Sequence, residues 1–176
     1  MSIKVLSSEK VLETRVFDLM KDQIELPSGK STSRFTIVHP GAAVFIPRLG
    51  PDRFLVIRQY RHALRREILE FPAGTLEKGE EPLDCAKREI CEEVGYAASK
   101  WTALGYVWTF PGFGNEILHA FLADDLSPNK AAADDDEMIE VVEMRKVQIE
   151  QAIVKNDLAD AKSISAWCRA GLLGLL

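Results

Sequence analysis

Residues 74–96 read GTLEKGEEPLDCAKREICEEVGY, and this segment predicts a short acidic helix that follows a glycine turn. Pro82 suits the first helical turn, where its missing N–H would have no partner in any case. Gly95 suits the helix exit. At about 100° per residue, one face of the helix is apolar and carries Leu83, Ala86, Ile90 and Val94. The carboxylates of Glu89, Glu92 and Glu93 gather on the adjoining edge, which we call the acidic edge.

The acidic edge has the composition of a site for a hard divalent cation. Glu89 and Glu93 are four residues apart, so their side chains lie one above the other and repel each other unless a cation is present. Mg²⁺ binds through a few carboxylates together with substrate phosphates, and a metal held in this way can activate water. Arg88 stands four residues before Glu92 and can hold that carboxylate in position. Taken alone, these charges are also typical of a solvated helix face.

The spacing of the whole segment resembles the signature of the Nudix hydrolase superfamily, Gly-x5-Glu-x7-Arg-Glu-U-x-Glu-Glu-x-Gly-U, in which U is a bulky aliphatic residue. The fixed positions of that signature are filled by Gly74, Glu80, Arg88, Glu89, Glu92, Glu93 and Gly95. Tyr96 is the one departure, because an aliphatic side chain is usual there.

The resemblance implies a metal site on this helix. It assigns Mg²⁺, with Mn²⁺ as the alternative, to Glu89, Glu92, Glu93 and the main-chain carbonyl of Ala73. It gives Glu89 and Glu93 a catalytic role, and it makes Glu80 and Arg88 supports of the metal ligands.

Residues outside the signature resemble the ADP-ribose pyrophosphatase branch of the superfamily. The runs RQYR (58–61) and LEFPAG (69–74) look like those that lead into the signature in that branch. Pro111 lies sixteen residues after Gly95, where the branch carries a proline, although a proline and a glycine in sequence are also typical of an ordinary turn.

This second resemblance implies the substrate contacts. Arg58 and Arg61 would bind phosphate, for which arginine forks are suited. Gly112 and Glu116 of the turn 111–116 would contact the substrate, Glu116 at the distal sugar. A general base would lie on the acidic stretch 134–137, with Glu137 as the choice and Asp135 as the fallback.

The rest of the chain predicts strands and two further helices. Helices are expected near 146–155 and 159–172, and the patterns typical of strands occur at 11–19, 22–26, 34–38, 41–47, 53–60, 67–74, 101–110, 115–124 and 137–144. Strands mixed with three helices fit an α/β class, and the Nudix fold that the resemblance implies is an α/β/α sandwich on a mixed sheet. We expect an N-terminal β region, 1–38, that forms a homodimer as in relatives, and a Nudix hydrolase domain, 39–176.

Composition narrows the functional class. A net charge of −5 and a pI near 5.3 argue against broad binding to nucleic acid or anionic membranes. The N-terminal residues have no apolar targeting region, and no run of about 18 apolar residues occurs. The three cysteines lack CxxC spacing and are typical of a reducing compartment, so we expect a cytoplasmic protein.

These observations together predict Mg²⁺-dependent hydrolysis of the pyrophosphate bond of ADP-ribose or a related nucleoside diphosphate sugar, which gives a nucleoside monophosphate and a sugar phosphate. One alternative has the same chemistry on GDP-mannose or on a broad range of nucleoside diphosphate sugars. Another is a nucleotide-sensing Nudix module without catalysis, but such modules typically lose signature carboxylates that are all present here. A purely structural domain would leave the acidic edge unexplained.

Overall fold

The computed structural model describes residues 2–129 and 138–176, which form two compact units. The smaller unit contains the chain up to Gly41 together with Trp108–Ile117. The larger unit contains Ala42–Val107 and the described part of Leu118–Leu176.

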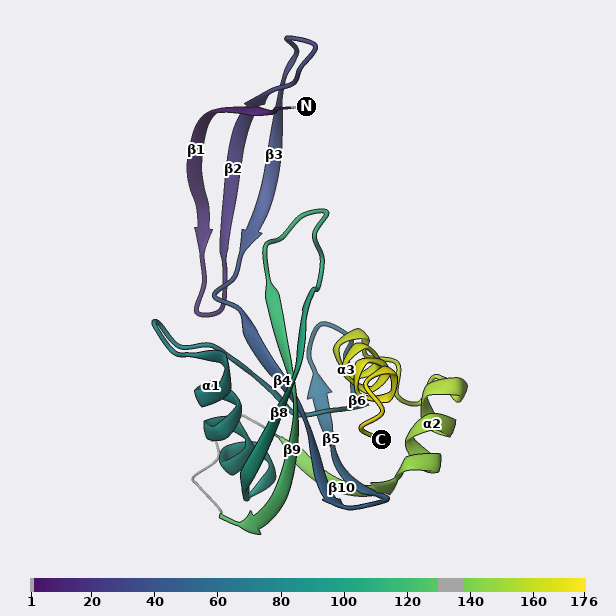
Figure 1. The fold of residues 1–176 in the computed structure, drawn as a ribbon. Coiled ribbons are helices and arrows are strands. Elements are labelled where there is room, and N and C mark those ends of the chain that lie inside the picture. Colours follow the sequence, from purple (N-terminus) through teal and green to yellow (C-terminus); the bar gives the residue numbers. More distant parts are fainter. Residues whose placement is uncertain (1, 130–137) are drawn as a thin grey trace. The chain divides into compact units, whose positions relative to one another are not determined.

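The smaller unit is built on an antiparallel sheet of three strands, β1 (Lys4–Glu13), β2 (Asp18–Glu25) and β3 (Ser31–Val38), paired in that order (Figure 1). Thr14 closes the turn between β1 and β2, because its Oγ1 accepts the N–H of Phe17 at 2.9 Å and donates to the carbonyl of Phe17 at 2.6 Å. The strand predicted at 11–19 is therefore interrupted: its ends lie in β1 and β2, and between them the threonine hydroxyl offers the backbone a local alternative to the strand ladder.

The segment Trp108–Ile117 joins this unit through β3. The N–H of Ile37 donates to the carbonyl of Phe113 at 2.8 Å, and the N–H of Asn115 donates to the carbonyl of Ile37 at 3.1 Å. The stacked rings of Phe110 and Phe113, 5.2 Å apart, fill the turn between these residues. The turn predicted around Pro111 is thus present.

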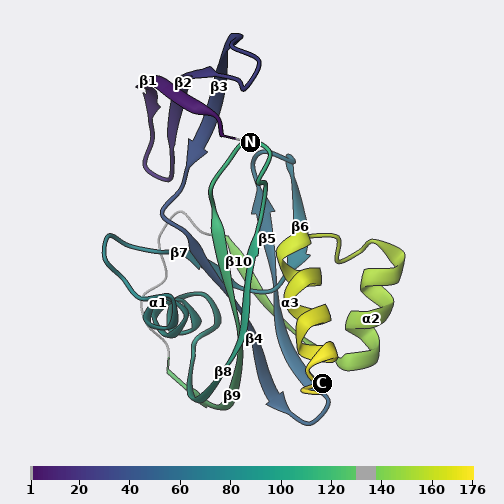
Figure 2. The same ribbon diagram turned by 45° about the horizontal axis from the view of Figure 1, so that its top comes forward.

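The larger unit contains a mixed sheet of seven strands (Figure 2). Its main path is β10 (Ile139–Arg145), β5 (Arg53–Arg61), β4 (Ala42–Gly50), β9 (Ile117–Pro128) and β8 (Tyr96–Trp108), while β6 (Arg66–Glu70) pairs with β5 and β7 (Ala73–Thr75) pairs with β4. β4 runs parallel to β9, whereas β5 is antiparallel to β4, β6 and β10.

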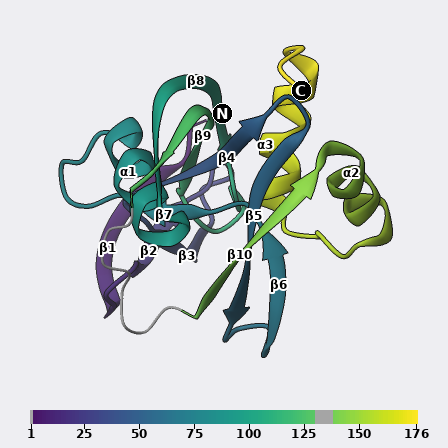
Figure 3. The ribbon, with the colours of Figure 1, turned by 90° about the horizontal axis from the view of Figure 1, so that it is seen from below.

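Helices cover both faces of this sheet (Figure 3). One face carries α1 (Pro82–Glu89), which continues as the π-helix η1 (Ile90–Val94), and the other carries α2 (Lys146–Lys155) and α3 (Ala161–Leu172). β4 supplies both cores because successive strand residues point to opposite faces: Phe45 packs with the α1 cluster and Val44 with the α2 and α3 cluster. The predicted α/β class with a mixed sheet is confirmed. No helix in the described residues is long and apolar enough to cross a membrane.

Two predicted elements near the acidic edge differ from the structure. The strand predicted at 67–74 is divided into β6 and β7, which pair with different strands, and Pro72 lies at the break, where it has no N–H to give to a ladder. Residues 76–81 lie between β7 and α1. The regular helix expected through Val94 changes to η1, and Gly95 ends it with a φ of 77°, which glycine adopts without strain.

Candidate active site

The apolar face of α1 and η1 fixes the acidic edge to the core. Cys85, Ala86 and Ile90 are fully buried and Val94 is nearly so, in a cluster that includes Phe45. This is the face that the sequence periodicity predicts. Burial of this face fixes the position of the adjoining edge, which carries Glu89, Glu92 and Glu93.

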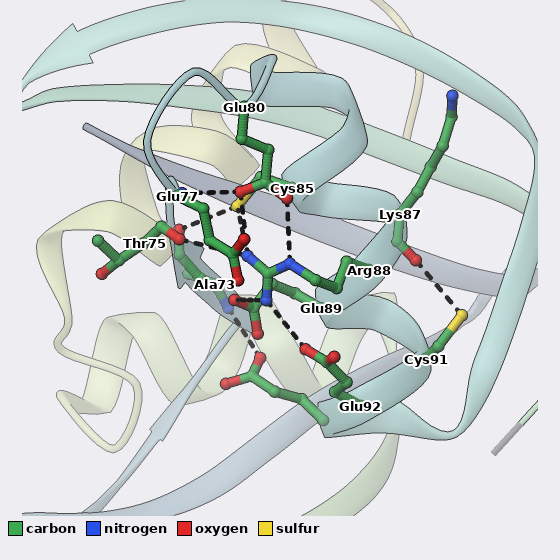
Figure 4. A network of polar contacts seen from close by, with 12 residues as sticks. Ala73, Thr75, Glu77, Glu80, Cys85, Lys87, Arg88, Glu89, Cys91 and Glu92 are labelled. Carbon is green, nitrogen blue, oxygen red and sulfur yellow. Dashed lines mark hydrogen bonds and ion pairs between the residues drawn. The ribbon is translucent and has the colours of Figure 1, made fainter. Parts of the chain in front are cut away.

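Arg88 lies at the centre of the acidic edge (Figure 4). Its Nε and Nη2 donate to Glu80 at 3.0 and 3.1 Å, and its Nη1 donates to Glu89 at 2.7 Å and to Glu92 at 2.9 Å. The predicted pairing of Arg88 with Glu92 is present. The hydrogen bond with Glu80 raises the pKa of Arg88 above its ordinary value, and the same bond lowers the pKa of Glu80. Arg88 therefore favours the ionised form of Glu80 and holds the carboxylates of Glu80, Glu89 and Glu92 close together.

Gly74 provides the surface on which Glu89 lies. A Cβ added to Gly74 would overlap the Cγ, Cδ and Oε1 atoms of Glu89, so only glycine admits this packing. The thiol of Cys85 donates to the carbonyl of Gly74 at 3.5 Å, and burial raises the pKa of Cys85 to about 12. The first fixed position of the signature thus has a steric reason in this chain.

Glu93 and Glu92 face different surroundings although they are adjacent. Glu93 is 8% exposed, and its Oε2 accepts the N–H of Ala73 at 3.0 Å. The side chain of Glu92 is 33% exposed. The carboxylate of Glu93 is therefore bound to β7, whereas that of the preceding residue, Glu92, is partly exposed.

The donors of the acidic edge fit a divalent metal by their chemistry. Glu89, Glu92, Glu93 and the carbonyl of Ala73 are all oxygen donors of the kind that hard cations prefer. Within residues 2–129 and 138–176, no three His, Cys, Asp or Glu side chains converge closely enough to hold a metal ion, and Arg88 lies against two of the carboxylates. The assignment of these residues as metal ligands stays a prediction.

Arg61 lies at the end of β5 and pairs with a carboxylate that the sequence reasoning did not single out. Its Nε and Nη2 each lie 2.8 Å from Oε1 of Glu70. The side chain of Glu70 is only 1% exposed, and its Oε2 accepts a hydrogen bond from Lys162 of α3. The sequence does contain a feature that could have identified Glu70: it is a charged residue inside the apolar run EILEFP (67–72). A charged residue in such a run is usually buried and paired with an opposite charge.

Arg58 and Arg61 do not share a face of β5. They are three positions apart in a strand whose side chains alternate, and Arg58 pairs with Glu140 of β10 at 3.2 Å. Arg58 also lines a cavity of about 650 Å³ together with residues of β6, β10 and α2. Its predicted contact with phosphate stays a prediction.

The remaining predicted residues lie elsewhere in the chain. Glu116 belongs to the smaller unit, where it accepts the hydroxyl of Thr109 at 2.6 Å and has an oxygen 3.5 Å from Nδ1 of His39. Gly112 is in the turn of the same unit, and an added Cβ there would meet nothing within 4 Å. Glu137 and Asp135 lie outside the described residues. The roles assigned to all four stay predictions.

Comparison with known proteins identifies the family. The model of the NUDIX domain matches residues 39–168. Over 165 residues the chain is 39% identical to an ADP-ribose pyrophosphatase of Bacillus subtilis (strain 168) and 36% identical to a methanol dehydrogenase activator of Bacillus methanolicus, each alignment covering 93% of this chain and 89% of the relative. A crystal structure of an ADP compounds hydrolase has a TM-score of 0.87 and 23% identity, covering 100% of this chain and 98% of the other, and shows the shared fold.

The matched residues include the acidic edge, Arg88 at its centre and the pair formed by Arg61 and Glu70. Hydrolases of this family generally use a divalent metal. As the sequence predicts, this chain belongs to the NUDIX family and has its fold.

Proposed function

We propose that this chain is a metal-dependent pyrophosphohydrolase that cleaves ADP-ribose, or a closely related nucleoside diphosphate sugar, to a nucleoside monophosphate and a sugar phosphate. The observation that carries the proposal is the acidic edge, where Glu89 and Glu92 are held by Arg88 and Glu93 is tied to Ala73. The relative named as an ADP-ribose pyrophosphatase supports this substrate, because the alignment spans most of both chains.

Glu89, Glu92, Glu93 and the carbonyl oxygen of Ala73 would hold Mg²⁺, or Mn²⁺ in its place. When bound, the metal would neutralise charge on the diphosphate and make the attacking water more acidic. To hold the ion, Glu89 and Glu92 would give up some of their hydrogen bonds with Arg88. Glu93 would keep its contact with the N–H of Ala73. The ligand oxygens of the helix and of Ala73 would then keep their positions relative to one another.

The other predicted residues would act on the substrate and on the water. Glu137 would accept a proton from the water as its oxygen bonds to phosphorus and the bridging oxygen leaves with the other phosphate. Arg61 would bind the diphosphate, with Arg58 as a further candidate. Glu116, with the turn at Gly112, would contact the distal sugar. Glu80 would hold Arg88 in place behind the ligands.

The proposal includes a homodimer formed through the N-terminal β region, 1–38, with residues 39–176 as the hydrolase domain. β1 supports it, because this strand is exposed along its whole length and includes apolar residues such as Val5 and Val11, which are 59% and 50% exposed. A sheet of three strands needs an apolar face covered to be stable. A second copy of the chain would supply that cover.

A substrate panel tests the function directly. The purified chain with Mg²⁺ is given ADP-ribose, GDP-mannose and UDP-glucose, and the products are identified by mass spectrometry. We expect the highest kcat/KM for ADP-ribose, with AMP and ribose 5-phosphate as products, and no turnover in EDTA. A preference for GDP-mannose would support the rival hydrolase, binding without product would support the sensing module, and turnover after rigorous chelation would contradict the metal requirement.

A further inference from the structure

We propose that Glu70 is a positioning residue for substrate binding: fixed by Lys162, it orients the guanidinium of Arg61 toward the diphosphate. The inference rests on the proposed function and deepens it, because it assigns a role to residues outside the family signature. It depends on the burial, the charges and the bonding geometry around Glu70.

Glu70 is a buried carboxylate held on both oxygens. Its side chain is 1% exposed, with Arg61 on Oε1 and Lys162 on Oε2. Asp160 balances the second cation, since its Oδ2 accepts from Lys162 at 2.8 Å. A buried charge is stable only when it is paired and its hydrogen-bonding capacity is met. With both oxygens occupied, Glu70 cannot rotate without breaking a bond to a cation.

The geometry of Arg61 leaves part of its guanidinium available. A guanidinium carries five N–H donors in a rigid plane, and Glu70 takes the side formed by Nε and Nη2. The opposite side, formed by Nη1 and the second N–H of Nη2, is directed away from Glu70. The side chain of Arg61 is 38% exposed, in contrast to its buried partner. Arg61 can therefore donate to an anion while Glu70 holds it in one orientation.

Gln59 gives independent evidence that a ligand group belongs beside Arg61. Gln59 precedes Arg61 by two residues in β5, so both side chains are on the same face of the strand. Gln59 is 6% exposed, and its Oε1 has no hydrogen-bond partner within the described part of the chain. Buried polar atoms in native proteins are nearly always bonded. The amide oxygen therefore needs a donor that the described residues do not supply, and we assign that donor to the substrate or to a water bound with it.

The first turn of α3 also binds the backbone of Phe71, which lies two residues before Ala73. Ser163 accepts the N–H of Phe71 at 2.7 Å and donates its hydroxyl to Asp160 at 2.6 Å. Residues 70 and 71 are therefore both bound to α3, and the chain continues through Pro72 to Ala73. Helix α3, on the face of the sheet opposite α1, holds the residues that lead into the candidate metal site.

Equilibrium binding tests whether Glu70 acts through Arg61. The ligand is the α,β-methylene analogue of ADP-ribose, which cannot be cleaved, titrated with Mg²⁺ into the full chain in a calorimeter. Arg61→Ala should raise Kd by about tenfold, as expected for a lost hydrogen bond between charged groups, and Glu70→Gln should raise it severalfold. In the Arg61→Ala background, Glu70→Gln should have no further effect, because coupled residues give non-additive changes.

Asp124→Asn is the matched control. Asp124 is a comparably buried carboxylate, 9% exposed, paired with Arg48 at 2.5 Å, so its loss should lower Tm and leave Kd unchanged. If Glu70→Gln does not fold, Glu70→Gln combined with Lys162→Met removes the charges as a pair. A Glu70 variant that lowers Tm but keeps the Kd of the unaltered chain, or effects that add to those of Arg61→Ala, would overturn the inference. Cleavage of ADP-ribose by the unaltered chain is measured separately, so failure of the proposed function is distinguished from failure of the coupling.

Discussion

Replacing Gly74 by alanine should displace Glu89 without removing any carboxylate from the candidate site. The added Cβ would overlap the Cγ, Cδ and Oε1 atoms of Glu89, so a rotation of the carboxylate group alone cannot relieve the contact. The whole side chain must move, and it is only 13% exposed. The bond from Arg88 to Glu89 moves or breaks with it.

The expected loss of activity is much larger than the loss of stability. Adding a methyl group to a packed site costs about 1–3 kcal/mol, and each kcal/mol lowers the Tm of a domain of this size by about 2–4 °C. Ordinary carbon contacts lie at about 3.5–4 Å, so Glu89 must shift by about 1 Å or more. A misplacement of about 1 Å in a reacting site can cost about 100-fold in rate.

The assay measures kcat for ADP-ribose at saturating Mg²⁺ and Tm by calorimetry. Gly50→Ala is the control, because the nearest atom to an added Cβ at that position is Nε of Arg53 at 4.0 Å; both of its values should stay close to those of the unaltered chain. Gly74→Ala combined with Glu89→Ala should recover part of the lost Tm but not the activity. Full kcat in Gly74→Ala would refute the argument that the position of Glu89 matters to the reaction.

Three further substitutions probe separate parts of the molecule. Glu93→Gln should lower kcat by orders of magnitude with Tm nearly unchanged, because an amide oxygen still accepts the N–H of Ala73; near-normal turnover would remove Glu93 from catalysis. Gln59→Leu should raise Tm by removing a buried polar atom without a described partner, worth about 1–3 kcal/mol, and should raise KM; a lower Tm with normal KM would contradict this. Burial raises the pKa of Asp160, but Lys162 and hydrogen bonds in the same turn outweigh burial and lower it overall. The stability gained is present above the ordinary pKa of about 3.9 and is lost as pH falls through the lowered value, so the Tm difference between the unaltered chain and Asp160→Asn should close in acid; a difference independent of pH would count against the pairing.

The acidic helix could be predicted because its determinants are local. Pro82 lies in the first turn, Ile90 and Val94 are buried on the predicted face, and Gly95 has the left-handed conformation that a helix exit requires. The pairing of Arg88 with Glu92 also follows from their spacing on a helix. Each of these features depends on residues only a few positions apart.

The support from α3 could not be predicted, because it joins residues far apart in the chain. Lys162 and Glu70 are separated by 92 positions. No local sequence pattern predicts which strand the end of a helix packs against. The turn at Thr14 was missed for a different reason: apolar residues continue on both sides of it, while the hydroxyl bonds that form the turn involve a single side chain. The break at Pro72 follows from a change of strand partner, which is a tertiary event.

Arg88 affects the stability of the acidic edge when no metal is bound. One guanidinium binds the carboxylates of Glu80, Glu89 and Glu92, so it serves as a resident counterion for side chains that would otherwise repel one another. A divalent ion at the proposed site would replace one positive partner with another, and its binding would not have to drive folding. If a chelator removes the ion from the proposed site, α1 should therefore stay folded, because Arg88 still pairs with these carboxylates.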